Sequence, residues 1–82
     1  MTDTQQPDTQ AGHYYVTMQR DTKYAFLLGP FDQHAEALAR VEEVRELAYR
    51  LDPRSHFDAF GTGRLSRELI GVPKGRLNSY LL

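Results

Sequence analysis

Hydrophobic and polar residues alternate along segment 14–19, a pattern typical of a β-strand with one buried face. Segment 24–28 also has the period of a strand. It is apolar on both faces, which indicates a strand inside the sheet rather than at its edge. The polar residues 20–23 between these segments have the length of a hairpin loop. The beginning of the chain therefore predicts a β-hairpin.

The spacing of apolar residues changes to three and four between Asp32 and Leu51, which predicts one amphipathic helix. Asp32 is expected at the N-cap, where its carboxylate can accept free backbone N–H groups. Pro53 disfavours helical geometry at Asp52 and is expected to end the helix. The predicted buried side consists of Ala37, Leu38, Val41, Val44, Ala48 and Leu51. The predicted exposed side consists of Glu36, Arg40, Glu42, Glu43, Glu46 and Arg50. Ion pairs four residues apart are expected between Glu36 and Arg40 and between Glu46 and Arg50.

Segment 55–60 alternates again and predicts a third strand, which a crossover helix would bring parallel to a neighbouring strand. Segment 61–63 is expected to end this strand, and segment 64–70 to form a short helical turn. The apolar segment 77–82 is expected to dock on the domain or on a second copy of the chain. The sequence thus predicts an α+β fold. We expect a small ββαβ domain with a three-stranded sheet covered by one amphipathic helix.

Length and composition permit one domain and exclude several classes of protein. Residues 1–12 are almost entirely polar, so a flexible, disordered tail is expected before a single domain at residues 13–82. The tail lacks the apolar core of a signal peptide, and no apolar run is long enough to span a membrane. A small soluble protein in the cytoplasm is therefore expected. The absence of cysteine excludes disulfides and thiolate metal sites. A core of about seventy residues is small, and a homodimer is one way to bury more surface.

The net charge is −1, but the charges are unevenly distributed. Residues 1–53 carry nine acids and five bases, a balance of −4, whereas residues 54–82 carry two acids and five bases, a balance of +3. Acidic and basic surfaces are therefore expected on different parts of the chain. The basic excess is too small to indicate a nucleic-acid-binding protein by itself.

Segment 61–64, Gly-Thr-Gly-Arg, resembles a phosphate-binding turn. Glycines after a strand can bring backbone N–H groups close to an anion, and an arginine can add a charged contact. The third glycine of the dinucleotide fingerprint and the Lys-Ser/Thr pair of the P-loop are missing. A turn that needs positive φ angles is the competing interpretation.

The residues that could support catalysis or metal binding do not form a motif. His13, His34 and His56 are isolated in the sequence, and each is expected to be a partly exposed side chain rather than a metal ligand. Ser55 and His56 would point to opposite faces of a strand, which places them poorly for nucleophilic catalysis. We therefore expect no enzymatic activity, no metal and no cofactor.

Aromatic residues concentrate in the predicted hairpin, at Tyr14, Tyr15, Tyr24 and Phe26. On an open sheet face such side chains can stack on bases, while arginine and lysine hold phosphates. A weak nucleic-acid-binding protein that uses these aromatics and the basic C-terminal residues is thus the alternative function. The other interpretation places the aromatics in the core under the helix, whose acidic face would repel a polyanion.

Segment 24–31, Tyr-Ala-Phe-Leu-Leu-Gly-Pro-Phe, followed by a helix containing segment 35–38, is similar to one half of a SPOR domain. That family has a peptidoglycan-binding fold. The likeness covers residues 24–38 and departs from the family because the first strand is not followed by a helix of its own. No signal or membrane anchor is expected before it.

A larger pattern resembles small uncharacterised proteins carried by proteobacterial plasmids, integrative elements and phages. It consists of segments 28–31 (Leu-Gly-Pro-Phe), 34–38 (His-Ala-Glu-Ala-Leu), 52–54 (Asp-Pro-Arg) and 59–62 (Ala-Phe-Gly-Thr). The resemblance implies an accessory gene of a mobile genetic element. Small proteins of this kind often occupy the surface of a host protein, as inhibitors of CRISPR or restriction systems do.

The sequence therefore favours a non-catalytic protein-binding module over a nucleic-acid-binding protein. The acidic helix face or an exposed sheet edge would contact a basic partner, and edge pairing would also explain self-association. The candidate partner-binding residues are Glu36, Glu42, Glu43, Glu46, Arg64 and Arg67.

Overall fold

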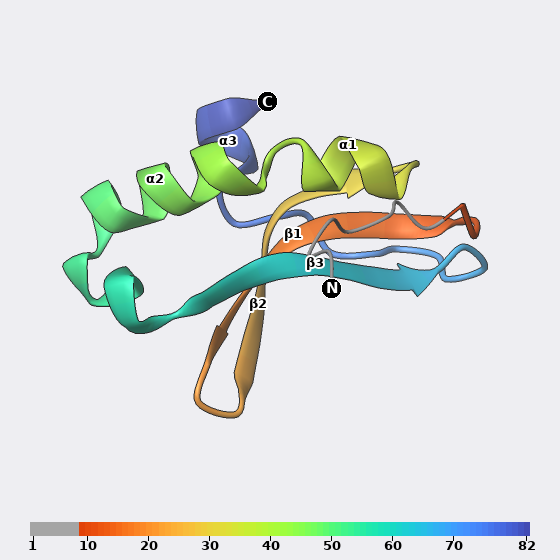
Figure 1. The fold of residues 1–82 in the computed structure, drawn as a ribbon. Helices are drawn as coiled ribbons and strands as arrows, with labels where there is room; N and C mark the ends of the chain where they lie inside the picture. The colour runs from red at the N-terminus through yellow and green to blue at the C-terminus, as the bar shows by residue number, and fades with distance from the viewer. Residues whose placement is uncertain (1–8) are drawn as a thin grey trace, which may run out of the picture.

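A three-stranded antiparallel β-sheet with helices on one face forms the fold (Figure 1). The computed structural model describes residues 9–82. The elements are β1 (Gly12–Arg20), β2 (Lys23–Phe31), α1 (His34–Leu38), α2 (Val41–Leu51), the 3₁₀ helix η1 (Pro53–Phe57), β3 (Ala59–Ser66) and α3 (Asn78–Leu81). The predicted α+β class, with a ββαβ order and a three-stranded sheet, is confirmed.

The strand order is β2-β1-β3, with β1 in the centre and both neighbours antiparallel to it. Thr17 of β1, for example, lies opposite Phe26 of β2 and Gly61 of β3. The prediction that the third strand lies parallel to a neighbour is wrong. The helices carry the chain from one edge of the sheet to the other, so β2 and β3 run in the same direction with β1 between them.

The prediction that the second strand lies inside the sheet is also wrong, because β2 forms an edge. Its outer side is covered by the C-terminal segment. Gly75 N–H donates to Gly29 O at 3.0 Å, and Leu77 N–H donates to Leu27 O at 2.7 Å. The side chain of Asn78 adds a bond from Gly29 N–H to its Oδ1 at 2.9 Å. The apolar residues of β2 pack on both sides of the sheet, since Leu28 lies in the core and Phe26 packs on Tyr15.

The predicted single helix is divided into α1 and α2 by a turn at residues 39–40. Arg40 N–H donates to Ala37 O, three residues back, which tightens the chain before α2 begins. The N-cap is Gln33 rather than Asp32, since Gln33 N–H donates to Glu36 Oε1 at 3.2 Å. Asp32 instead accepts a hydrogen bond from Arg67 at 2.9 Å.

The core lies between the sheet and the helix layer. Val16 and Leu28 of the sheet are fully buried, as are Ala37 of α1 and Val44 of α2. The predicted inward positions Ala37, Val44 and Ala48 are thereby confirmed. Leu51 is half exposed because it lies in the last turn of α2, so its predicted burial is wrong.

The third strand begins later than predicted. Segment 53–57 is the 3₁₀ helix η1, which has Pro53 in its first turn and Asp52 as its N-cap. Asp52 Oδ1 accepts Arg54 N–H at 3.0 Å, and this cap favours a helical turn over an extended chain. The predicted strand at 55–60 is therefore replaced by β3 at Ala59–Ser66.

The predicted helical turn at 64–70 is wrong, because its first three residues continue β3 and Ile70 is 98% exposed. The C-terminal docking is confirmed for Leu77 and Leu81, which pack on the core, whereas Tyr80 is exposed.

The predicted tail, residues 1–12, falls largely outside the described residues, which begin at 9. Gly12 already belongs to β1, and Ala11 O accepts a hydrogen bond from Arg64 at 3.1 Å. Within residues 9–82, no helix is long and apolar enough to cross a membrane.

Candidate functional site

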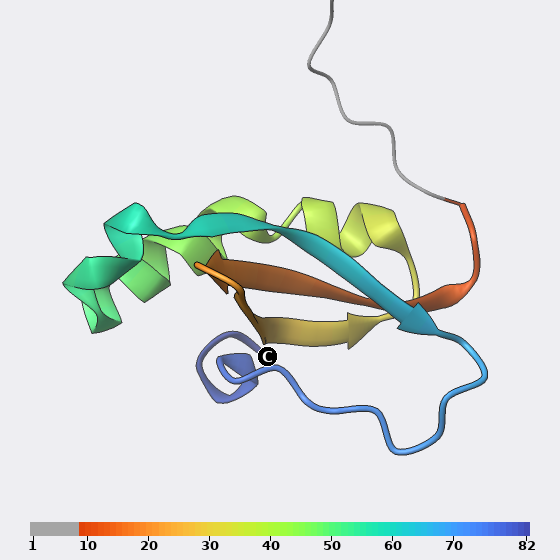
Figure 2. The same cartoon turned by 90° about the horizontal axis from the view of Figure 1, so that it is seen from below.

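The outer edge of β3 is the open edge of the sheet. β3 pairs with β1 along its whole length, and among residues 9–82 the one further backbone hydrogen bond to it is a turn bond at its last residue, from Leu69 N–H to Ser66 O at 3.1 Å. Figure 2 shows β3 along one side of the sheet and the C-terminal segment along the other, beside β2. Every second residue of such an edge directs its N–H and C=O groups outward, where another strand can pair with them.

The composition of β3 does little to prevent such pairing. Natural edge strands are usually short or carry proline, lysine or other charges. β3 has eight residues, contains no proline or lysine, and has Arg64 as its one charged side chain. Its backbone is therefore accessible to an added strand.

The segment 61–64 lies inside β3 and does not form a turn. Neither the phosphate-binding interpretation nor the positive-φ interpretation is correct, since the glycines with positive φ in the described chain are Gly29 and Gly71. Gly63 is required for packing, because a Cβ there would lie 3.1 Å from Thr17 Cγ2. Gly61 has no atom within 4 Å of the corresponding position.

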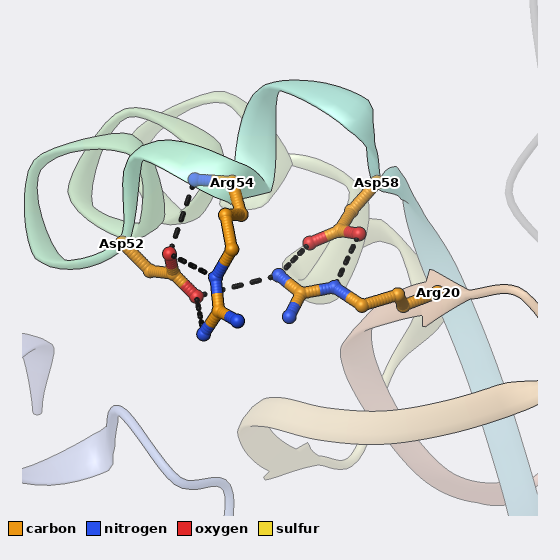
Figure 3. Close-up of polar contacts among 4 residues, drawn as sticks. All are labelled: Arg20, Asp52, Arg54 and Asp58. Carbon is orange, nitrogen blue, oxygen red and sulfur yellow. Dashed lines mark hydrogen bonds and ion pairs between the residues drawn. The ribbon is translucent and has the colours of Figure 1, made fainter.

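A cluster of ion pairs fixes the start of β3 to the end of β1 (Figure 3). Arg20 binds Asp58 through two hydrogen bonds, Nε to Oδ1 at 2.8 Å and Nη2 to Oδ2 at 2.6 Å. Its Nη2 also lies 3.4 Å from Asp52 Oδ2, and Asp52 in turn contacts Arg54. The side chain of Asp58 is only 1% exposed, so this bidentate pair is well shielded. We call these four residues the Arg20 clamp.

The pKa values of Arg20, Asp52 and Asp58 are shifted within the Arg20 clamp. Hydrogen bonds from Arg20 hold the pKa of Asp58 below its ordinary value. Hydrogen bonds from Arg54 lower the pKa of Asp52, and the hydrogen bond to Asp58 raises the pKa of Arg20. These shifts favour the ionised forms, as expected of an ion-pair network that holds two segments together.

A groove lies beside the clamp, between the hairpin, the end of α2 and the C-terminal segment. Its larger part has a volume of about 440 Å³ and is lined by Met18, Arg20, Lys23, Tyr24, Ala25 and Arg76. A second part, of about 230 Å³, shares Met18, Arg20 and Arg76 with the first. The residues that line only this second part are the apolar Leu27, Ala48, Leu51 and Leu77 and the polar Asp52 and Ser55. We call both parts together the basic groove.

The four predicted acidic residues are all exposed on the helix layer, but three of them have partners in the chain. Arg40 pairs with Glu43, and Arg45 pairs with Glu42, each three residues apart. Glu36 accepts Gln33 N–H. These contacts replace the predicted pairs four residues apart. Residues 34–51 contain four acids and three arginines, so the helix surface is only weakly acidic.

The two predicted basic residues lie at the end of β3 or just beyond it. Arg64 donates to Ala11 O at 3.1 Å, and Arg67 binds Asp32 just before α1. The candidate residues thus lie in two places, on the helix layer and near the end of β3, and both places border the same strand.

The aromatic residues of the hairpin do not form an open stacking surface. Tyr14 and Tyr15 are buried on opposite faces of β1. Tyr14 stacks on His34 beneath α1, with 5.1 Å between ring centroids, and Tyr15 packs on Phe26 at 4.5 Å. Tyr24 is exposed. The platform that the nucleic-acid alternative requires is therefore missing two of its four rings.

The three histidines have different environments, and His13 is partly exposed, as predicted. His34 is buried, contrary to the prediction, and its Nε2 lies 2.7 Å from Thr62 Oγ1. His56 is exposed and stacks on Tyr49, whereas Ser55 is buried. In the described part of the chain, no group of three or more His, Cys, Asp or Glu residues could hold a metal ion.

Sequence reasoning missed the Arg20 clamp and the basic groove. The pair of Arg20 and Asp58 joins residues 38 apart, so no local periodicity signals it. Comparison with protein-family models, curated proteins and solved structures finds no match to this chain.

Proposed function

We propose that this protein is a small non-catalytic accessory factor that binds another protein by adding a strand of that partner to β3. The observation that carries the proposal is the contrast between the two edges of the sheet. The C-terminal segment covers β2, whereas among residues 9–82 no backbone group bonds to the outer side of β3 before its last residue, Ser66. An exposed strand of this length offers main-chain hydrogen bonds to an extended segment.

The exposed acids of α2 beside β3 favour a partner segment with basic side chains. α2 packs over β3 and carries Glu46, an exposed acid for which the described residues provide no ion pair. Glu42 and Glu43 are exposed beside it, although each already contacts an arginine. Charge complementarity would speed the association of the partner, whereas the backbone of β3 would provide most of the contact.

The resemblance to proteins of plasmids, integrative elements and phages supports a host protein as the partner. An inhibitor of the CRISPR or restriction type would act by occupying a surface that the host machinery needs. Strand addition suits this role because it requires a free edge and no reactive group. A second copy of the chain would compete for the same edge, so some self-association through β3 belongs to the proposal.

Hydrogen exchange of an isolated complex tests the proposal. The protein is used as bait in a proteobacterial lysate, the complex is purified, and amide exchange of the bait is compared with the free protein by mass spectrometry. Slower exchange across residues 59–66 is expected, since their outward amides gain acceptors. Protection confined to α1 and α2 would contradict strand addition and would indicate a helix-face contact.

Two variants at one position sharpen the test. Phe26 O accepts Arg76 N–H, so Phe26 faces away from β1, and its partner Thr17 directs its backbone groups to Gly61. Since this direction alternates along β3, Arg64 presents its N–H on the outer side. Arg64→Pro removes this N–H and is expected to weaken capture more than Arg64→Ala, which keeps it. Circular dichroism verifies that each variant folds. If the proline variant does not fold, the exchange pattern of the unaltered protein decides alone. Sedimentation of the free protein separates partner binding from self-association.

A further inference from the structure

The Arg20 clamp leaves part of the Arg20 side chain free for a ligand. Its Nε and Nη2 bind Asp58 and Asp52, and Figure 3 shows the remaining nitrogen of the guanidinium directed away from both carboxylates. The buried carboxylate of Asp58 fixes the orientation of this group. A donor that is already held in place loses little freedom when it binds a ligand.

Two further cations line the larger part of the basic groove. The side chains of Lys23 and Arg76 have no hydrogen bond or ion pair with the described residues, although they approach from different segments of the chain. No carboxylate lines this part of the groove. The three cations therefore converge on a hollow of about 440 Å³, which lies within the size range of ligand sites.

The walls next to these cations are apolar. Met18 lines both parts of the groove, and Leu27, Leu51 and Leu77 continue the apolar surface into the second part. Leu51 is half exposed there, so its side chain would gain burial if a ligand covered it. A bare anion such as phosphate would leave this surface uncovered, whereas a chain of methylene groups would cover it.

We propose that the basic groove binds a single-chain anionic amphiphile of the fatty-acid class. The carboxylate would contact Arg20, Lys23 and Arg76, and the alkyl chain would lie along Met18 towards Leu51. The charges of Lys23 and Arg76, together with the remaining N–H groups of Arg20, select an anionic head, and the apolar wall selects a tail. This site lies beside the hairpin and the C-terminal segment, so it is separate from the outer edge of β3.

Titration of ¹⁵N-labelled protein with decanoate tests the inference, with amide shifts as the readout. Saturable shifts are expected at residues 18–25 and 76–77. Acetate supplies the head without the tail, and octyl glucoside supplies a tail without the charge. Both are expected to bind at least about tenfold more weakly, since each lacks one of the two contributions. Equal binding of octyl glucoside, or no saturable shift with decanoate, would overturn the proposal.

Two substitutions then locate the site. Lys23→Gln and Arg76→Gln are each expected to weaken decanoate binding about tenfold, because each removes a charged contact. Lys74→Gln is the matched control, since Lys74 is a cation of the same C-terminal segment that does not line the groove. Unchanged binding in both groove variants, or equal weakening by Lys74→Gln, would refute the assignment. None of these substitutions touches β3, so failure here leaves the strand-addition proposal standing.

Discussion

Replacing Val44 with alanine tests the packing of α2 on the sheet, on which the rest of the fold depends. Val44 is fully buried in the core between α2 and the sheet. Removal of two buried methyl groups costs about 1.6 kcal/mol of transfer free energy at roughly 0.8 kcal/mol per carbon. A residual cavity of roughly 40 Å³ adds up to about 1 kcal/mol. The free energy of unfolding is therefore expected to fall by about 2–2.5 kcal/mol, which lowers Tm by roughly 10–20 °C in a domain of this size.

Thermal melting followed by circular dichroism measures this change, and Ile70→Ala provides the control. Ile70 is 98% exposed, so its replacement removes a larger side chain and is expected to change stability by less than about 0.5 kcal/mol. The Tm of the two variants should differ, although both substitutions shorten an aliphatic side chain. The reasoning is refuted if Val44→Ala melts within about 2 °C of the unaltered protein. It is equally refuted if Ile70→Ala lowers Tm by the same amount.

Three further predictions concern the clamp, the covered edge and the nucleic-acid alternative. Because the pKa of Asp58 is lowered in the folded state, its ion pair stabilises the fold above pH about 4 and is lost as the carboxylate protonates. Asp58→Asn should therefore lower Tm at pH 7 and flatten the decline of Tm from pH 5 to about pH 3; an unchanged decline would contradict this. Gly75→Val would place Cβ 2.6 Å from Leu27 O, so it should cost about 1–3 kcal/mol and speed amide exchange of β2, whereas Gly61→Ala should do neither. Single-stranded RNA should show no retention even at about 50 mM salt, and retention that falls steeply with salt would revive that function.

The hairpin and the helical residues could be predicted from the sequence because hydrophobic periodicity reports local geometry. Spacings of three to four placed Val44 on the buried face of the helix correctly. The alternation in β1 predicted one buried face, whereas both faces are buried, at Tyr14 and at Tyr15. Strand order could not be predicted in this way, because periodicity identifies the faces of a strand and not its neighbours. β2 has the pattern of an interior strand since Gly75 and Leu77 cover its outer side from the other end of the chain.

The candidate site was harder to predict because it depends on contacts between distant residues. Glycines weaken strands, so the sequence predicts a turn at segment 61–63. The structure gives Gly63 a packing role in β3, because a Cβ there would lie 3.1 Å from Thr17 Cγ2. The partner of Arg20 is likewise set by the course of η1, which delivers Asp58 to the end of β1. An open edge was predicted as one of two binding surfaces, but the sequence alone could not identify which strand carries it.

The way in which β3 is held has a consequence for binding. Its start is fixed through Asp58, which is bound to Arg20, and its middle through Thr62, which is bound to His34. Its end is fixed through Arg64, which donates to Ala11 O. All three contacts reach β3 through side chains, so none of them uses its outer backbone groups. β3 is therefore a strand that is already ordered before a partner arrives. A segment that pairs with β3 loses its own conformational freedom on binding, but β3 loses little because it is already ordered. The entropic cost of binding is therefore smaller at this edge than at a mobile edge strand.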